Sequence, residues 1–95
     1  MYFKVSAHAL DKHLDYNRVN TSVFFDEDTL YQCVYQCLKY PEHRIKNGDR
    51  FEAMKTFPYP IGYAKCGRET NDTVKVVFKK TKKSIYVITA YPIYS

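Results

Sequence analysis

The sequence has no apolar run long enough to cross a membrane. A transmembrane helix needs roughly 18 or more consecutive apolar residues, and no stretch of this 95-residue chain approaches that length. The opening segment, MYFKVSAHALDKH, also lacks the apolar stretch of a secretory signal peptide. We therefore expect neither a membrane partner nor an export signal, although a domain cut from a larger carrier protein would share this pattern.

Cysteine is too scarce, and its number is odd, for a disulfide framework. Of the three cysteines, Cys33 and Cys37 lie in LYQCVYQCL and Cys66 lies alone in AKCGRE. If residues 27–40 are helical, one apolar stripe results, made of Leu30, Cys33, Val34, Cys37 and Leu38. Both cysteines of the stripe are then expected in the core. A zinc site would need two more ligands at recognisable spacing, which His43 alone does not supply, so we predict no metal and no cofactor.

What the sequence does contain is enough apolar material for one packed core. Hydrophobic residues make up 45% and aromatic residues 17% of the chain, which is typical of a globular protein and excludes a disordered tail. No linker divides the chain, and its length suits a single modest core. We expect one domain spanning residues 1–95.

Positive charge is concentrated in the second half of the chain. Residues 1–42 carry four basic and six acidic side chains, a net charge of −2, whereas residues 43–95 carry eleven basic and four acidic, a net charge of +7. A basic half on a small domain indicates a polyanionic partner, most often nucleic acid. The alternative is a surface whose charges only keep the protein soluble.

The hydrophobic pattern predicts an α+β fold. MYFKV reads as a first strand, HALDKHLDY as a short helix, and DEDTLYQCVYQCLKY as a second helix with acidic residues in its first turn and Pro41 after its end. The strand-like segments that follow are RFEAMKTF, PYPIGYAKC, TVKVVFKK and SIYVITAYPI, and KKTKKS reads as a hairpin tip. We therefore expect two N-terminal helices packed on a four- to five-stranded antiparallel sheet.

Residues suited to cutting RNA without a metal appear at both ends of this pattern. Such cleavage needs a base for the 2′-hydroxyl, an acid for the departing 5′ oxygen, and donors for the charge on the phosphorane. His8 and Lys12 lie four apart on the first predicted helix and share a face, whereas His13 lies on a different one.

The remaining candidates lie on predicted strands. Arg50 opens the first strand after the helices. Thr89 and Tyr91 are two apart in the last strand, so they point to one side of the sheet, and Val87 is expected to join them there. Ile88 and Ala90 are expected on the other side.

Each of these residues also has an ordinary structural explanation. His8 could cap or cover a helix, His13 could pack on the sheet, and Arg50 could be a solvated charge. Thr89 and Tyr91 are common in strands, and the chain has ten tyrosines, most of which must be structural.

Three segments in order resemble the superfamily of small nucleases and toxins that includes barnase, EndoU, colicin and RelE proteins. They are HALDKHLDYNRV, EDTLYQCVYQCLKYPEHRIKNGDRF and VKVVFKKTKKSIYVITAYPI. Members with a leading His-Ala helix place a basic residue one turn later, end a second helix near Pro-Glu, and close with a Thr-x-Tyr-like strand. The matching positions are His8, Lys12, Pro41–Glu42, Arg50 and Thr89–Tyr91. The closing ITAYP also resembles ribonuclease A-like bacterial toxin domains.

The chain departs from the first pattern at three places. Lys12 replaces the usual arginine, and His13 stands where an apolar residue is expected. FPYPIGYAKCGRET is longer than its counterpart in compact members, and it offers Arg68 as a further phosphate contact.

The resemblance implies a toxin-like, metal-independent endoribonuclease that acts in the cytoplasm on RNA such as tRNA or mRNA. It implies His8 as acid or base, Lys12 and Arg50 as cations at the phosphate, Thr89 as a donor, and Tyr91 as a donor or base-stacking partner. The remaining candidates for holding RNA are His13, Arg68, Lys79, Lys80, Lys82 and Lys83. Whether an antitoxin or immunity protein neutralises the chain stays open.

Two other functions fit the same residues. One is a non-catalytic module that grips nucleic acid or an acidic protein, such as a phage-encoded inhibitor of a host defence enzyme. The other is a structural or assembly protein in which His8 and Thr89 only pack.

Overall fold

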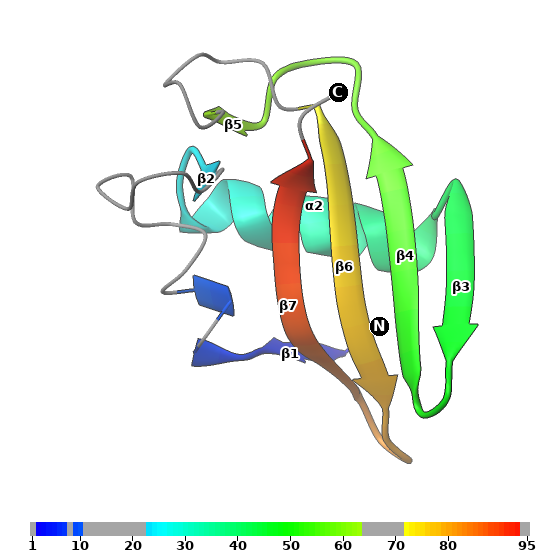
Figure 1. Cartoon of the computed structure of the whole chain (residues 1–95). Coiled ribbons are helices and arrows are strands. Elements are labelled where there is room, and N and C mark those ends of the chain that lie inside the picture. Colours follow the sequence, from blue (N-terminus) through cyan, green and yellow to red (C-terminus); the bar gives the residue numbers. More distant parts are fainter. Residues whose placement is uncertain (1, 8, 11–22, 64–71, 94–95) are drawn as a thin grey trace.

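A five-stranded mixed sheet forms the frame of the protein, with strand order β1-β7-β6-β4-β3 (Figure 1). The computed structural model describes residues 2–7, 9–10, 23–63 and 72–93. The strands of this sheet are β1 (Phe3–Val5), β3 (His43–Asn47), β4 (Arg50–Thr56), β6 (Thr73–Lys80) and β7 (Ile85–Ile93). The α+β class is confirmed.

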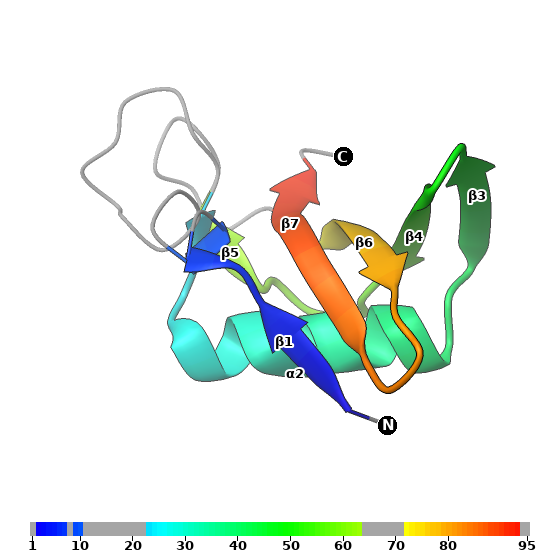
Figure 2. The same ribbon diagram turned by 90° about the horizontal axis from the view of Figure 1, so that it is seen from below.

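The helix α2 (Glu27–Lys39) packs across one face of this sheet (Figure 2). Asp26 caps its N-terminus, because its Oδ1 accepts a hydrogen bond of 2.7 Å from the Thr29 backbone N–H. The predicted stripe of Leu30, Cys33, Val34, Cys37 and Leu38 is confirmed as the buried side of the helix. No helix within the described ranges is long and apolar enough to cross a membrane.

The core lies between α2 and the sheet. Cys33 and Cys37 of the helix pack in it as small apolar side chains. Cys37 Sγ lies 3.8 Å from the Val74 carbonyl oxygen, which accepts a weak hydrogen bond from the thiol. Burial raises the pKa of the Cys33 and Cys37 thiols to about 12 each. Both thiols are therefore protonated near neutral pH and serve packing.

The prediction of an all-antiparallel sheet is wrong at one edge, where β1 pairs with β7 in parallel. Parallel neighbours need a long crossover connection, and here nearly the whole chain separates the two strands. Sequence periodicity identified both strands but carried no information on which strand the N-terminal one would join.

The other edge strand, β3, was not predicted. Its side chains are exposed on both faces of the sheet, so no apolar alternation marks it in HRIKN. A two-residue turn at Gly48 and Asp49, with Gly48 at φ 62°, joins it to β4. Arg50 therefore opens the second strand after α2, and the sequence expectation that it opens the first is corrected.

The predicted strand around Ile61 and Tyr63 does not enter the main sheet. It forms β5 (Gly62–Tyr63), which pairs antiparallel with β2 (Val23–Phe24). A side chain at Gly62 would place its Cβ 2.0 Å from the Val23 carbonyl oxygen, so only glycine fits there.

Most of the first predicted helix lies outside the described residues. Its start is described: Ala7, Ala9 and Leu10 are helical. Ser6 caps this start, because its carbonyl accepts from the Leu10 N–H at 3.2 Å and its Oγ accepts from the Ala9 N–H at 3.2 Å.

We predict that Leu30→Ala lowers the free energy of unfolding by about 2–5 kcal/mol, because a fully buried side chain leaves a cavity between α2 and the sheet. Urea denaturation followed by circular dichroism measures this loss. Gln32→Ala on the exposed side of the same helix is the control and should change stability by about 0.5 kcal/mol or less. Equal effects of the two substitutions would contradict the placement of α2.

Candidate functional site

The candidate site is the face of the sheet opposite α2, which we call the outer face. In Figure 2, α2 lies against the other face, where Ala53, Val76 and Ala90 are fully buried. Strand register alternates side chains between the two faces. The outer face of the three central strands consists of Arg50, Glu52, Met54 and Thr56 in β4, Thr73, Lys75, Val77 and Lys79 in β6, and Tyr86, Thr89 and Tyr91 in β7.

A β-bulge at Ile88 directs Thr89 and Tyr91 to the outer face. Val87 pairs with Phe78 and Thr89 pairs with Val77, so Ile88 is an extra residue in β7. An extra residue reverses the side to which the following side chains point. Val87 is fully buried on the side of α2, and the expectation that it shares a side with Thr89 and Tyr91 is corrected.

Ser6 ties the start of the first helix to this bulge. Its backbone N–H donates to the Val87 carbonyl at 3.0 Å, and its Oγ donates to the Ile88 carbonyl at 2.6 Å. The same Oγ accepts from the Ala9 N–H. The almost fully buried Ser6 hydroxyl therefore caps the helix start and also donates to the backbone carbonyl next to Thr89. The N-terminal and C-terminal parts of the chain meet here.

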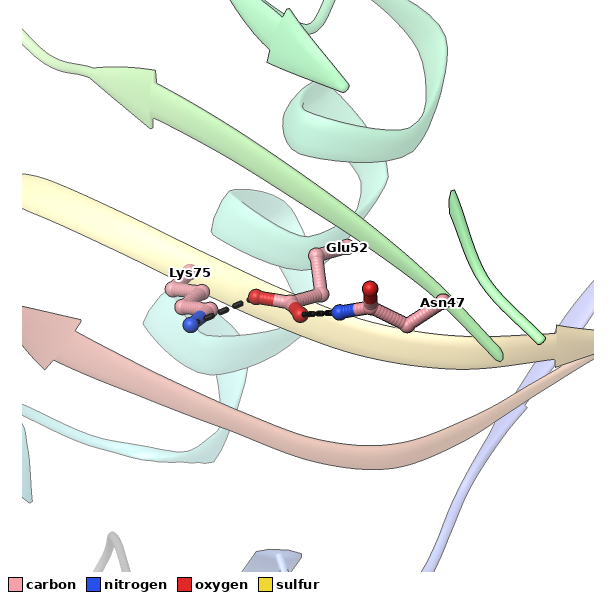
Figure 3. A network of polar contacts seen from close by, with 3 residues as sticks. All are labelled: Asn47, Glu52 and Lys75. Carbon is pink, nitrogen blue, oxygen red and sulfur yellow. Dashed lines mark hydrogen bonds and ion pairs between the residues drawn. The ribbon is translucent and has the colours of Figure 1, made fainter. Parts of the chain in front are cut away.

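A row of polar side chains crosses the outer face from β3 to β6 (Figure 3). Asn47 Nδ2 donates to Glu52 Oε2 at 2.8 Å, and Glu52 Oε1 lies 2.5 Å from Lys75 Nζ. The hydrogen bond from Lys75 lowers the pKa of Glu52. The bond to Glu52 raises the pKa of Lys75, and the neighbouring Tyr91 raises it further. Near neutral pH, Glu52 is ionised and Lys75 is charged.

The structure places four of the predicted site residues on this one face: Arg50, Lys79, Thr89 and Tyr91. Thr89 and Tyr91 are half-buried in β7, and Arg50 is exposed at the start of β4. Because adjacent strands lie about 4.8 Å apart, Arg50 and Thr89 are separated across β6 by about 10 Å in the hydrogen-bonding direction. Thr89 is level with Glu52, so Arg50 is also displaced by two residues, about 7 Å, along the strands. A ligand lying over β6 would reach both side chains.

The predicted lysine cluster does not act as one group. Lys79 faces outward and lies 3.3 Å from Asp49 Oδ2. Lys80 faces the α2 side, with its Nζ 4.9 Å from the Phe51 ring centroid. Lys82 and Lys83 are exposed in the turn between β6 and β7. Because consecutive strand residues point to opposite faces, Lys79 and Lys80 lie on opposite faces of the sheet, and Lys82 and Lys83 lie at the hairpin end.

The other predicted site residues are His8, Lys12, His13 and Arg68, which lie outside the described residues. Of these, His8 is flanked by the described Ala7 and Ala9, two residues after Ser6. Among the residues that the structure does describe, no group of three or more histidine, cysteine or acidic side chains could hold a metal ion.

Sequence reasoning missed Lys75, Glu52 and Ser6. Lys75, Val77 and Lys79 are two residues apart in TVKVVFKK, so strand alternation alone predicts that their side chains point to the same face of the sheet. The partnership of Lys75 with Glu52 depends on the register between β4 and β6, which no local pattern specifies. Ser6 directly before a helical pattern is an N-cap signal, but its bond to Ile88 is set by the fold.

We predict that Ser6→Ala lowers the free energy of unfolding by about 1–3 kcal/mol, because the Ile88 carbonyl and the Ala9 N–H both lose their side-chain partner. Ser6→Thr keeps the hydroxyl, so its free energy of unfolding should fall by less than that of Ser6→Ala. Denaturant titration of the wild type and both variants checks this order of stabilities. A Ser6→Ala protein as stable as the wild type would show that the helix start and the bulge are held by other contacts.

We predict that the coupling between Glu52 and Lys75 depends on pH. The lowered pKa of Glu52 means that its contribution is present above the unfolded pKa of about 4.3 and disappears as pH falls through the lower folded value. The raised pKa of Lys75 means that its contribution is present below about 10.4 and disappears as pH rises through the higher folded value.

A double-mutant cycle with Glu52→Gln, Lys75→Gln and the double variant measures this coupling in urea unfolding at several pH values. The coupling should be largest near neutral pH and should vanish at strongly acidic pH. The same coupling at every pH would contradict an ionic contact.

Comparison of the chain with protein-family models, with curated proteins and with solved structures gives no match. Its function is therefore inferred from its own residues.

Proposed function

We propose that this chain is a metal-independent endoribonuclease that binds RNA across the outer face of the sheet. The observation that carries the proposal is the contact of Ser6 with Ile88. It brings the described helical residues Ala7, Ala9 and Leu10, next to His8 in sequence, to the strand that presents Thr89 and Tyr91. A base or acid and hydroxyl donors can then act on one phosphodiester.

The described part of the outer face supplies cations and donors for a phosphate. Arg50, Lys75 and Lys79 contribute positive charge, and Glu52 and Asp49 offset part of it. Thr89 and Tyr91 add hydroxyl groups. Donors held on strands stabilise the charge that develops on the phosphorane without reorganising during the reaction. The three cations and the two carboxylates together leave a net charge of +1.

The proposed reaction moves two protons. A base removes the proton of the 2′-hydroxyl, and the 2′ oxygen bonds to the adjacent phosphorus. The bond from phosphorus to the 5′ oxygen breaks, and an acid protonates that oxygen, which leaves a 2′,3′-cyclic phosphate. His8 takes the part of base or acid because an imidazole has an ordinary pKa near 6.5. Arg50 and Thr89 contact the non-bridging oxygens.

A nucleic-acid-binding module without catalysis is the second candidate. Tyr86 favours it, because its side chain lies on the outer face and is 40% exposed. Aromatic side chains on a sheet can stack on bases of a single strand without any acid or base nearby.

Incubation of the purified protein with total RNA in EDTA tests the proposal. We expect cleavage by the wild type, a loss of about 10²–10⁴-fold in His8→Ala, and losses of about 10²-fold in Arg50→Ala and Thr89→Val. The control is Gln32→Ala, which removes an exposed side chain on the side of α2 turned away from the sheet and should cleave normally.

Each contrary result has a definite meaning. Undetectable cleavage by the wild type together with RNA binding would support the second candidate and contradict the first. Cleavage that persists in His8→Ala would contradict the role of that imidazole.

A further inference from the structure

A second group of cations lies on the α2 side of the sheet, around a pair of stacked phenylalanines. The rings of Phe51 and Phe78 are 5.5 Å apart at an interplanar angle of 18°. Lys80 Nζ and Lys46 Nζ lie 4.9 and 5.8 Å from the Phe51 centroid, and Arg44 Cζ lies 5.9 Å from that of Phe78. We call Arg44, Lys46 and Lys80 the cationic patch.

The cations of this patch are exposed, and the ion pairs found in the described residues do not include them. On the outer face, in contrast, Lys75 and Lys79 each have a carboxylate partner. The three charges are held over aromatic rings instead. Their positive charge therefore remains available to an anionic ligand.

The cationic patch and the outer face meet at one end of the sheet. The turns of the β3–β4 and β6–β7 hairpins both lie at that end (Figure 1). Lys79 of the outer face is followed directly by Lys80 of the patch. Between the two faces, the β6–β7 turn carries exposed Lys82 and Lys83. Positive side chains thus continue from one face to the other around the hairpin ends.

We propose that a single RNA strand bound on the outer face continues around this end of the sheet onto the cationic patch. This inference rests on the proposed function and names its substrate class: RNA with a single-stranded segment longer than the outer face alone can hold. The cations of the patch would hold its phosphates. Phe51, half-buried under two flexible lysines, would offer a ring on which a base can stack.

Salt dependence of binding tests the inference. The probes are single-stranded oligodeoxynucleotides of about 4 and about 16 nucleotides, the range of lengths held by small single-strand-binding domains. They lack the 2′-hydroxyl and cannot be cleaved. Each neutralised phosphate contributes about −0.7 to the slope of log K against log salt for single strands. Fluorescence anisotropy measures this slope.

The variants are Lys46→Gln and Arg44→Gln/Lys46→Gln. Lys39→Gln is the matched control, because Lys39 is also an exposed lysine over an aromatic ring, 5.4 Å from the Tyr35 centroid, but it lies at the end of α2. Circular dichroism verifies that each variant is folded.

For the long probe, we expect the slope to become shallower by about 0.7 in Lys46→Gln and by about 1.4 in the double variant. The short probe should bind all variants alike, and Lys39→Gln should match the wild type. Unchanged slopes for the long probe, with the wild type still binding, would overturn this inference alone. In that case Arg44 and Lys46 would serve only to keep the exposed edge strand β3 from pairing with another chain. A wild type that binds neither probe would overturn the proposed function as well.

Discussion

The hydrogen bond from the Ser6 hydroxyl to the Ile88 carbonyl is the contact on which the arrangement of the candidate site depends. Ile88 is the extra residue of a bulge, and bulges locally disrupt the ladder and leave backbone groups in need of partners. Ser6 provides that partner while capping the start of a helix. Because Ile88 precedes Thr89 directly, the same bond fixes where the N-terminal helix begins relative to the hydroxyls of the last strand.

The bulge also gives the two faces of the sheet different chemistry. Before it, Val87 contributes to the core under α2; after it, Ala90 takes over that role, and Thr89 and Tyr91 point away. The outer face therefore combines half-buried hydroxyls with an ion pair of Glu52 and Lys75. The side of α2 is apolar in its centre, and Arg44, Lys46 and Lys80 gather on it towards the hairpin ends. A strand of regular alternation would have buried the hydroxyls.

The sequence predicted the helix and the strands far better than it predicted which strands pair and which distant side chains meet. The buried stripe of α2 follows from helical spacing, and the strands β4, β6 and β7 follow from β-branched and aromatic residues. The edge strand β3 carries no apolar alternation because both of its faces are exposed, so periodicity could not find it. A bulge has no local signature in SIYVITAYPI, so the side of Val87 was assigned wrongly. The parallel pairing of β1 with β7 and the contact of Glu52 with Lys75 join residues far apart in sequence, which only the folded chain brings together.

Nuclear magnetic resonance of the ¹⁵N-labelled protein, titrated with a single-stranded oligodeoxynucleotide, tests most directly whether the outer face is where nucleic acid binds. We predict that the amide signals of Arg50, Lys75 and Thr89 shift when the oligodeoxynucleotide binds. The signals of Gln32 and Gln36, on the side of α2 turned away from the sheet, should stay in place. Shifts confined to α2, with none in β6 and β7, would contradict the account.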